Sequence, residues 1–229
     1  MKTKQQGFTL VEIAIVLVII GLLLGGILKG QEMITQAKIK NAISDFSGIS
    51  AAYHGYLDRY RFIPGDDPCA GTPTPGACSA PAARWAAASA SGNGNGQVAG
   101  KYNSLTATDE SRLWWEHLRH AGFVAGSGSN QPFNAVTGII GVQTGDAQAP
   151  IGPVWGGLVS LIMCSANLPD KIATAVDVQM DDGVPNSGTV RGALHTGGPN
   201  PDVGGAGGLT VSAAYAETGT NVYTLCRAL

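Results

Sequence analysis

The sequence predicts an α+β fold, in which a long amino-terminal helix packs on a small antiparallel β-sheet, with two short helices and Gly-rich loops on the periphery. Three observations predict this class. Residues 1–63 lack proline and keep apolar residues at helical spacing. Beyond residue 100, two shorter segments have helical spacing, and short runs of β-forming residues are bounded by Gly. A chain of 229 residues is long enough for one moderate domain and an anchor.

The first part of the long helix is a predicted membrane span. Glu12 is the only formally charged residue between Phe8 and Leu28. At about 1.5 Å per residue, this segment forms a helix of roughly 30 Å, the thickness of a bilayer core. Lys2 and Lys4 precede the span, so we expect the leader to stay in the cytoplasm and the residues after the span to be exported.

Glu12 needs a cationic partner, because a carboxylate inside an apolar span is costly unless it is paired. Cleavage after Gly7 would supply this partner, since the new amino group of Phe8 lies at nearly the same depth. The two groups can meet within one helix or between staggered copies of the chain. The alternative is an ordinary signal anchor whose single acid reaches toward the lipid headgroups.

The residues from Lys2 to Glu12 resemble the leader and mature start of type IV prepilins and type II secretion pseudopilins. A short basic leader ends at Gly7, Phe8 follows, and Glu12 lies four residues further on. The resemblance covers residues 1 to about 65, and beyond them only the general architecture is similar. It implies that a membrane peptidase cuts between Gly7 and Phe8 and methylates the new amino terminus. The implied partners are this prepilin peptidase and methyltransferase, other pilin or pseudopilin copies, and an inner-membrane assembly platform.

These patterns divide the chain into four parts. They are a prepilin leader at 1–7, a transmembrane and filament-core helix at 8–29, its amphipathic continuation at 30–62, and an exported globular α+β domain at 63–229. The amphipathic part has apolar residues at steps of three to five: Ile34, Ile39, Ile43, Phe46, Ile49, Tyr53, Tyr56 and Tyr60.

Pro64 and Gly65 are expected to end the long helix near Arg61. The following stretch, to about Tyr102, is rich in Ala, Gly, Pro and Ser and predicts a loop, with 92–96 as its most flexible part. The resemblance implies that this is the variable segment of the fold.

A second helix is predicted from Thr108, its expected cap, to about Ala121. Its two histidines, His117 and His120, are expected at the surface or rim rather than on a metal. Trp115 is expected at an interface or a second core contact. Pro169 is expected at the first position of a third helix. Strands are expected at 138–142, 158–164, 189–194, 209–215 and 221–225, and a mobile loop at 197–208.

Four cysteines in an exported chain predict two disulfides. Three pairings are possible. Cys69–Cys78 and Cys164–Cys226 are favoured, because the first closes a short Pro/Gly-rich loop and the second ties the carboxy-terminal strand to the middle of the domain. A zinc site would need closely spaced ligand pairs, which the sequence lacks.

Acidic residues crowd the carboxyl end of the third helix, where the helix dipole disfavours negative charge. A bound calcium ion, held by Asp181, Asp182 and the loop at Asn186, would offset them. The resemblance adds that some secretion pseudopilins bind calcium in a late loop. Pairing with Arg191 or plain solvation is the alternative.

The leading hypothesis is a structural subunit of a type IV pilus or type II secretion filament. A minor tip subunit, acting as an adhesin-like binding module, is the alternative. We expect a single-pass inner-membrane protein with a periplasmic carboxy-terminal domain before assembly, and a periplasmic or cell-surface filament afterwards. Without Lys2 and Lys4 the chain has 12 basic and 16 acidic side chains, which disfavours nucleic acid as a ligand. Neither G-x-S-x-G nor H-E-x-x-H occurs, so we expect no enzyme, and no cofactor other than calcium.

Overall fold

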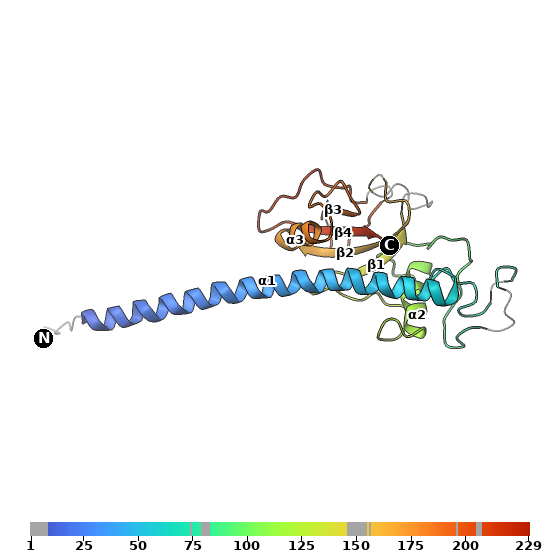
Figure 1. Cartoon of the computed structure of the whole chain (residues 1–229), viewed down its shortest axis with the longest axis horizontal. Coiled ribbons are helices and arrows are strands. Elements are labelled where there is room, and N and C mark those ends of the chain that lie inside the picture. Colours follow the sequence, from blue (N-terminus) through green and yellow to red (C-terminus); the bar gives the residue numbers. More distant parts are fainter. Residues whose placement is uncertain are drawn as a thin grey trace, which may run out of the picture. The chain divides into compact units, whose positions relative to one another are not determined.

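The structure, a computed structural model, describes residues 9–73, 75–78, 83–145, 155, 157–195, 197–204 and 208–229. Its helices are α1 (Leu10–Tyr60), α2 (Glu110–His120) and α3 (Asp170–Met180). Its strands are β1 (Ile140–Thr144), β2 (Leu161–Pro169), β3 (Val190–Leu194) and β4 (Val222–Ala228). Figure 1 shows these elements in chain order. The predicted class is confirmed, because a long amino-terminal helix and two short helices accompany a four-stranded antiparallel sheet.

The chain forms two compact units, with the boundary between Lys38 and Ile39 inside α1. In the first unit, large apolar side chains are exposed on all sides of the helix, among them Leu17 at 64% and Leu22 at 73%. A helix that is apolar all round is stable only in apolar surroundings, such as lipid or other helices.

In the second unit, the last part of α1 buries one face. Its buried residues are Ile39, Ala42, Phe46, Ala52, Tyr53 and Tyr56, and all but the adjacent pair Ala52 and Tyr53 are three to six residues apart. The helix ends at Tyr60, close to the predicted end, and Gly65 follows with a φ of 83°. A Cβ at Gly65 would lie 2.3 Å from the carbonyl oxygen of Glu110, so only glycine allows the chain to pass α2 this closely.

The sheet has the strand order β1-β2-β4-β3, and every neighbouring pair is antiparallel. Successive side chains of β2 point to opposite faces. Leu161 and Met163 belong to a core shared with α1, α2 and α3, whereas Ile162 and Cys164 belong to a second core. The second core is completed by residues outside the helices: Tyr102, Trp155, Leu158, Val203 and Leu209. The sheet is therefore buried on both faces, by helices on one and by loops on the other.

Both favoured disulfides are present. Cys164 pairs directly with Cys226 across β2 and β4, and the bond lies in the second core. Cys69 is joined to Cys78 and closes a short loop after α1. No cysteine among the described residues is free.

Four of the five expected strands exist, with shifted ends. The fifth, at 209–215, was predicted wrongly: its described residues form a single bridge, between Val203 and Leu209. This segment instead meets β3 through separate hydrogen bonds, such as Ser212 N to the Gly192 carbonyl oxygen at 2.9 Å and Leu194 N to Ser212 Oγ at 2.8 Å. It contributes apolar cover to the sheet without a continuous ladder.

The second helix is not peripheral, contrary to expectation. Every residue of α2 from Glu110 to Leu118 is buried, and the helix begins after Asp109 rather than Thr108. Trp114 and Trp115 are both fully buried in the core, where their rings lie edge to face with centroids 4.8 Å apart. The spacing of apolar residues in α2 predicted the face that packs toward the sheet. The opposite face is covered by the long loop after α1, and the sequence of this loop has no periodic pattern that would have predicted the contact.

Candidate functional site

The start of α1 is closed by a reciprocal pair of side-chain bonds. The Glu12 carboxylate accepts hydrogen bonds from Thr9 N at 2.8 Å and from Thr9 Oγ1 at 2.7 Å, while Glu12 N donates to Thr9 Oγ1 at 3.3 Å. This is a capping box, in which Thr precedes Glu by three residues. Sequence reasoning missed this role of Glu12, although the Thr-x-x-Glu spacing signals it. Gly7 and Phe8 lie outside the described residues.

By length and composition, α1 is the one described helix that is able to cross a membrane. Its apolar part contains Glu12 one turn from its start, so the capped carboxylate lies at the edge of the apolar surface. The cap satisfies backbone hydrogen-bonding groups at the start of the helix but does not neutralise the Glu12 carboxylate. The carboxylate therefore remains available to a cationic partner.

Three carboxylates gather at the carboxyl end of α3. Oxygens of Asp177, Asp181 and Asp182 all lie within 4.8 Å of one another. Asp177 is fully buried; its Oδ2 accepts a hydrogen bond from the Tyr215 hydroxyl at 2.6 Å, whereas its Oδ1 makes no hydrogen bond of normal geometry among the described residues. Burial raises the pKa of Asp177, and the Tyr215 hydroxyl and the nearby Gly183 amide act in the opposite direction. A buried carboxylate oxygen without a partner is costly, and a cation would satisfy it.

The other two carboxylates are fixed by the loop that follows. Asp181 Oδ2 accepts bonds from the amides of Thr189 and Val190, at 2.5 and 2.9 Å. Asp182 accepts from Val184 N at 2.8 Å and from the Ser187 hydroxyl at 2.5 Å. These bonds preorganise the oxygens around Asp177.

Asn186 and Arg191 are joined within the loop after α3. The backbone carbonyl oxygen of Asn186 accepts a bond from Arg191 Nη1 at 2.9 Å, and the expected role of Asn186 as a calcium ligand stays a prediction. The Ser187 hydroxyl, the Val184 amide and, more weakly, the charge of Arg191 lower the pKa of Asp182. The alternative, in which Arg191 neutralises the acidic residues, is therefore supported in part. Arg191 acts on the charge of Asp182 but not on that of Asp177.

A second set of buried acids holds the long loop after α1. Asp66 Oδ1 and Oδ2 accept bonds from the amides of Gly94, Asn95 and Gly96, at 2.7, 3.0 and 2.7 Å. Glu110 accepts from Asn93 N at 3.1 Å. Burial raises the pKa of both carboxyl groups. The stretch 92–96, expected to be the most flexible part of the loop, is therefore bound through its backbone.

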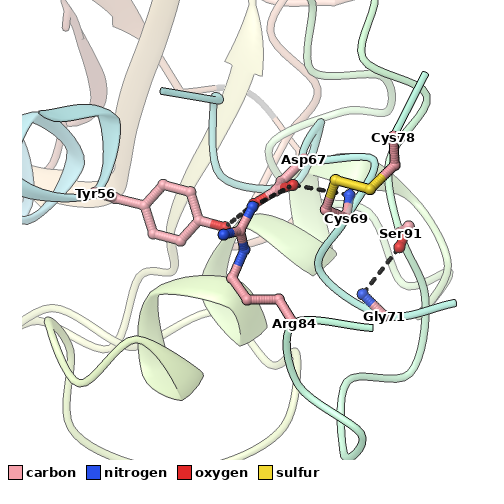
Figure 2. Close-up of a disulfide and its surroundings, with 7 residues drawn as sticks. All are labelled: Tyr56, Asp67, Cys69, Gly71, Cys78, Arg84 and Ser91. Atoms are coloured by element: carbon pink, nitrogen blue, oxygen red, sulfur yellow. Dashed lines mark hydrogen bonds and ion pairs between the residues drawn. A yellow bond between two sulfur atoms is a disulfide. The ribbon is translucent and has the colours of Figure 1, made fainter. Parts of the chain in front are cut away.

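The neighbouring acid, Asp67, joins the disulfide loop to α1 (Figure 2). Its buried carboxylate accepts a bond from the Tyr56 hydroxyl at 2.6 Å and from Cys69 N at 2.9 Å, and lies 3.3 Å from the Arg84 guanidinium. Figure 2 shows Tyr56 and Arg84 converging on Asp67 beside the Cys69–Cys78 bond. The sequence contains one indication of this role, because Asp66 and Asp67 are consecutive acids in a loop with few charged residues.

His117 is fully buried, so its expected position at the surface or rim is wrong. Its Nδ1 accepts a bond from Gly65 N at 2.9 Å, and its Nε2 lies 3.1 Å from the Ala90 carbonyl oxygen. Burial lowers its pKa, which favours the neutral ring that these two bonds require. His117 thus ties α2 to the loop on both sides.

These features describe a helix long and apolar enough to cross a membrane, followed by a disulfide-linked α+β body. A family model described as the prokaryotic N-terminal methylation motif matches residues 2–28. The chain therefore carries the prepilin signal of type IV pilins and pseudopilins, and its fold is pilin-like. Comparison with curated proteins and with solved structures found no significant match.

The motif has direct consequences for this chain. It implies processing by a prepilin peptidase and assembly with other pilins, and it suggests a structural subunit rather than an enzyme. The motif and the long apolar helix together fit a membrane-anchored pilin.

Proposed function

We propose that the chain is a structural subunit of a type IV pilus or type II secretion filament, cut after Gly7 and assembled through its amino-terminal helix. The observation that carries this proposal is the N-terminal methylation motif at residues 2–28. The exposed apolar surface of α1 before Lys38 supports it, because packing such helices together removes that surface from water or lipid.

The proposed orientation places the leader in the cytoplasm and the second unit in the periplasm. Basic residues beside a span favour the cytoplasmic side, and Lys2 and Lys4 precede this one. Two disulfides support export of the body, since they persist in oxidising compartments. After assembly, the second unit coats a filament in the periplasm or at the cell surface.

Native material tests the proposal directly. The amino-terminal peptide should begin at Phe8 and carry the mass of one added methyl group, and the protein should be abundant in sheared filaments. An uncleaved amino terminus would contradict the processing, and a processed protein that is absent from filaments would contradict the structural role. A processed protein present at trace level would instead support the minor tip subunit.

We further propose that the three carboxylates at the end of α3 bind calcium. The supporting observation is the buried, unpartnered Oδ1 of Asp177 beside the oxygens of Asp181 and Asp182. Calcium accepts six to eight oxygen ligands, so loop carbonyls and water would complete the site. The ion would join the end of α3 to the loop that leads into β3.

Calcium should therefore stabilise the full chain, and Asp177→Asn should remove the effect. At a calcium concentration about 100 times the Kd, binding contributes about 2.7 kcal/mol, which raises the melting temperature of a chain this size by about 5–10 °C. The asparagine can still accept the Tyr215 bond, so the variant should remain folded and be at least as stable as wild type without calcium.

Thermal unfolding in detergent micelles, with calcium and with a chelator, measures both effects. Asp58→Asn is the matched control, because Asp58 is an exposed acid whose side chain is 82% accessible. It should keep the full calcium response. An equal response of wild type and Asp177→Asn, or no response in either, would contradict the calcium site.

A further inference from the structure

A cavity of about 550 Å³ lies in the second unit, and neither the acidic cluster nor α1 contributes to its lining. Residues before and within α2, the segment before β1, and the loop after β3 line it. Its polar lining consists of one guanidinium, from Arg112, and four carboxamides: Asn103, Asn130, Gln131 and Asn200. A volume of this size accommodates a ligand of one or two sugar rings or a short peptide.

Arg112 gives the cavity an uncompensated positive charge. The residue is only 7% exposed, and its guanidinium donates to four neutral oxygens: Ser129 O at 2.7 Å, Ser129 Oγ at 3.4 Å, Ser104 O at 3.2 Å and Asn130 Oδ1 at 2.5 Å. Among the described residues, no carboxylate lies within ion-pair distance of it. A buried cation without an anion is costly, and a ligand carboxylate would neutralise it.

The carboxamides offer both donors and acceptors. The amide groups of Asn103 and Gln131 donate to protein oxygens, which leaves their own oxygens as acceptors. Asn130 and Asn200 are held the other way round: their oxygens accept from Arg112 and from Ile139 N, which leaves their amide groups as donors. Sugar hydroxyls both donate and accept hydrogen bonds, so this mixed set suits them. A peptide carboxylate alone would require donors only.

The rim adds an apolar surface. Phe133 is 70% exposed and Leu105 is 91% exposed, and both line the cavity. An exposed aromatic ring beside polar amides provides a face for the C–H groups of a sugar ring, while the amides bind its edge.

We propose that this cavity binds a short acidic saccharide, with Arg112 on its carboxylate, the four carboxamides on its hydroxyls and Phe133 on its ring face. The proposal goes beyond the filament role, because assembly through α1 makes no use of this cavity. It gives the surface of the subunit a recognition function of its own.

Ligand-detected NMR or calorimetry on the full mature chain in detergent micelles tests this proposal. The acidic probes are digalacturonate, methyl glucuronide and a methyl sialoside. The dimethyl ester of digalacturonate is the uncharged control. We expect at least one acidic probe to bind, and esterification of digalacturonate to weaken its binding about ten-fold. No binding by any acidic sugar at about 10 mM, or equal binding of acid and ester, would overturn the proposal.

Three variants locate the binding. Phe133→Ala, at an exposed position, should remain folded and weaken binding about five-fold, whereas Val159→Ala, at an exposed position outside the cavity, should leave it unchanged. Arg112→Gln should remove the preference for the acid over the ester. Binding that is insensitive to Phe133→Ala would overturn the assignment to this cavity. Binding of a free-acid dipeptide such as Gly-Phe, without binding of any sugar, would reassign the cavity to peptides.

Discussion

A Gly7→Leu variant is expected to accumulate in the membrane as the uncut precursor. The proposed cut follows Gly7, and we expect a bulky side chain at this position to obstruct the peptidase where the small residue allows access. We expect loss of nearly all mature protein and of filaments, measured by intact mass and by shearing.

A substitution of the same bulk within the leader provides the control. Gln5→Leu should be processed normally, because Gln5 is the third residue before the proposed cut. Mature protein of normal mass from the Gly7→Leu chain would contradict the proposed site.

Glu12→Gln is expected to be processed normally but to enter filaments about ten-fold less well than wild type. Gln can replace Glu in a capping box, so the start of α1 is preserved while the charge is lost. Assembly would then leave the amino group of Phe8 unpaired in an apolar environment, at a cost of at least about 1.4 kcal/mol. The ratio of protein in sheared filaments to protein in membranes measures the effect.

Thr9→Ala separates capping from charge. It removes the cap, which costs about 1 kcal/mol of helix stability, but keeps the carboxylate. We expect near-normal incorporation of this variant. Normal incorporation of Glu12→Gln together with a defect in Thr9→Ala would assign Glu12 to capping alone and remove its role in pairing between subunits.

The elements predicted correctly depend on local patterns. The apolar run before Leu28, the spacing from Ile39 to Tyr56 and the two short helices all repeat within a few residues, so the sequence carries their signal directly. The pairing of the cysteines was predicted from the expected export of the domain and from the positions of the cysteines along the chain.

The features that the sequence did not reveal depend on contacts between distant residues. Asp66 binds amides 28 to 30 residues away, and His117 binds Gly65 from 52 residues away. Composition suggested only a flexible loop there. At the acidic cluster, the sequence identified the crowded carboxylates, but only the fold shows that Asp177 is buried and that Arg191 donates to the Asn186 backbone carbonyl.

Two buried acids, Asp66 after α1 and Glu110 at the start of α2, have a consequence for how this surface can evolve. The carboxylates of Asp66 and Glu110 accept hydrogen bonds from backbone N–H groups, not from side chains. The donors are Asn93, Gly94, Asn95, Gly96 and Ala99. Every residue except proline supplies such a group. Gly94 and Gly96 have positive φ, which favours glycine, but at the other positions the side chains can be exchanged while the backbone path is retained, so this loop tolerates a change of its surface without a change of its fold.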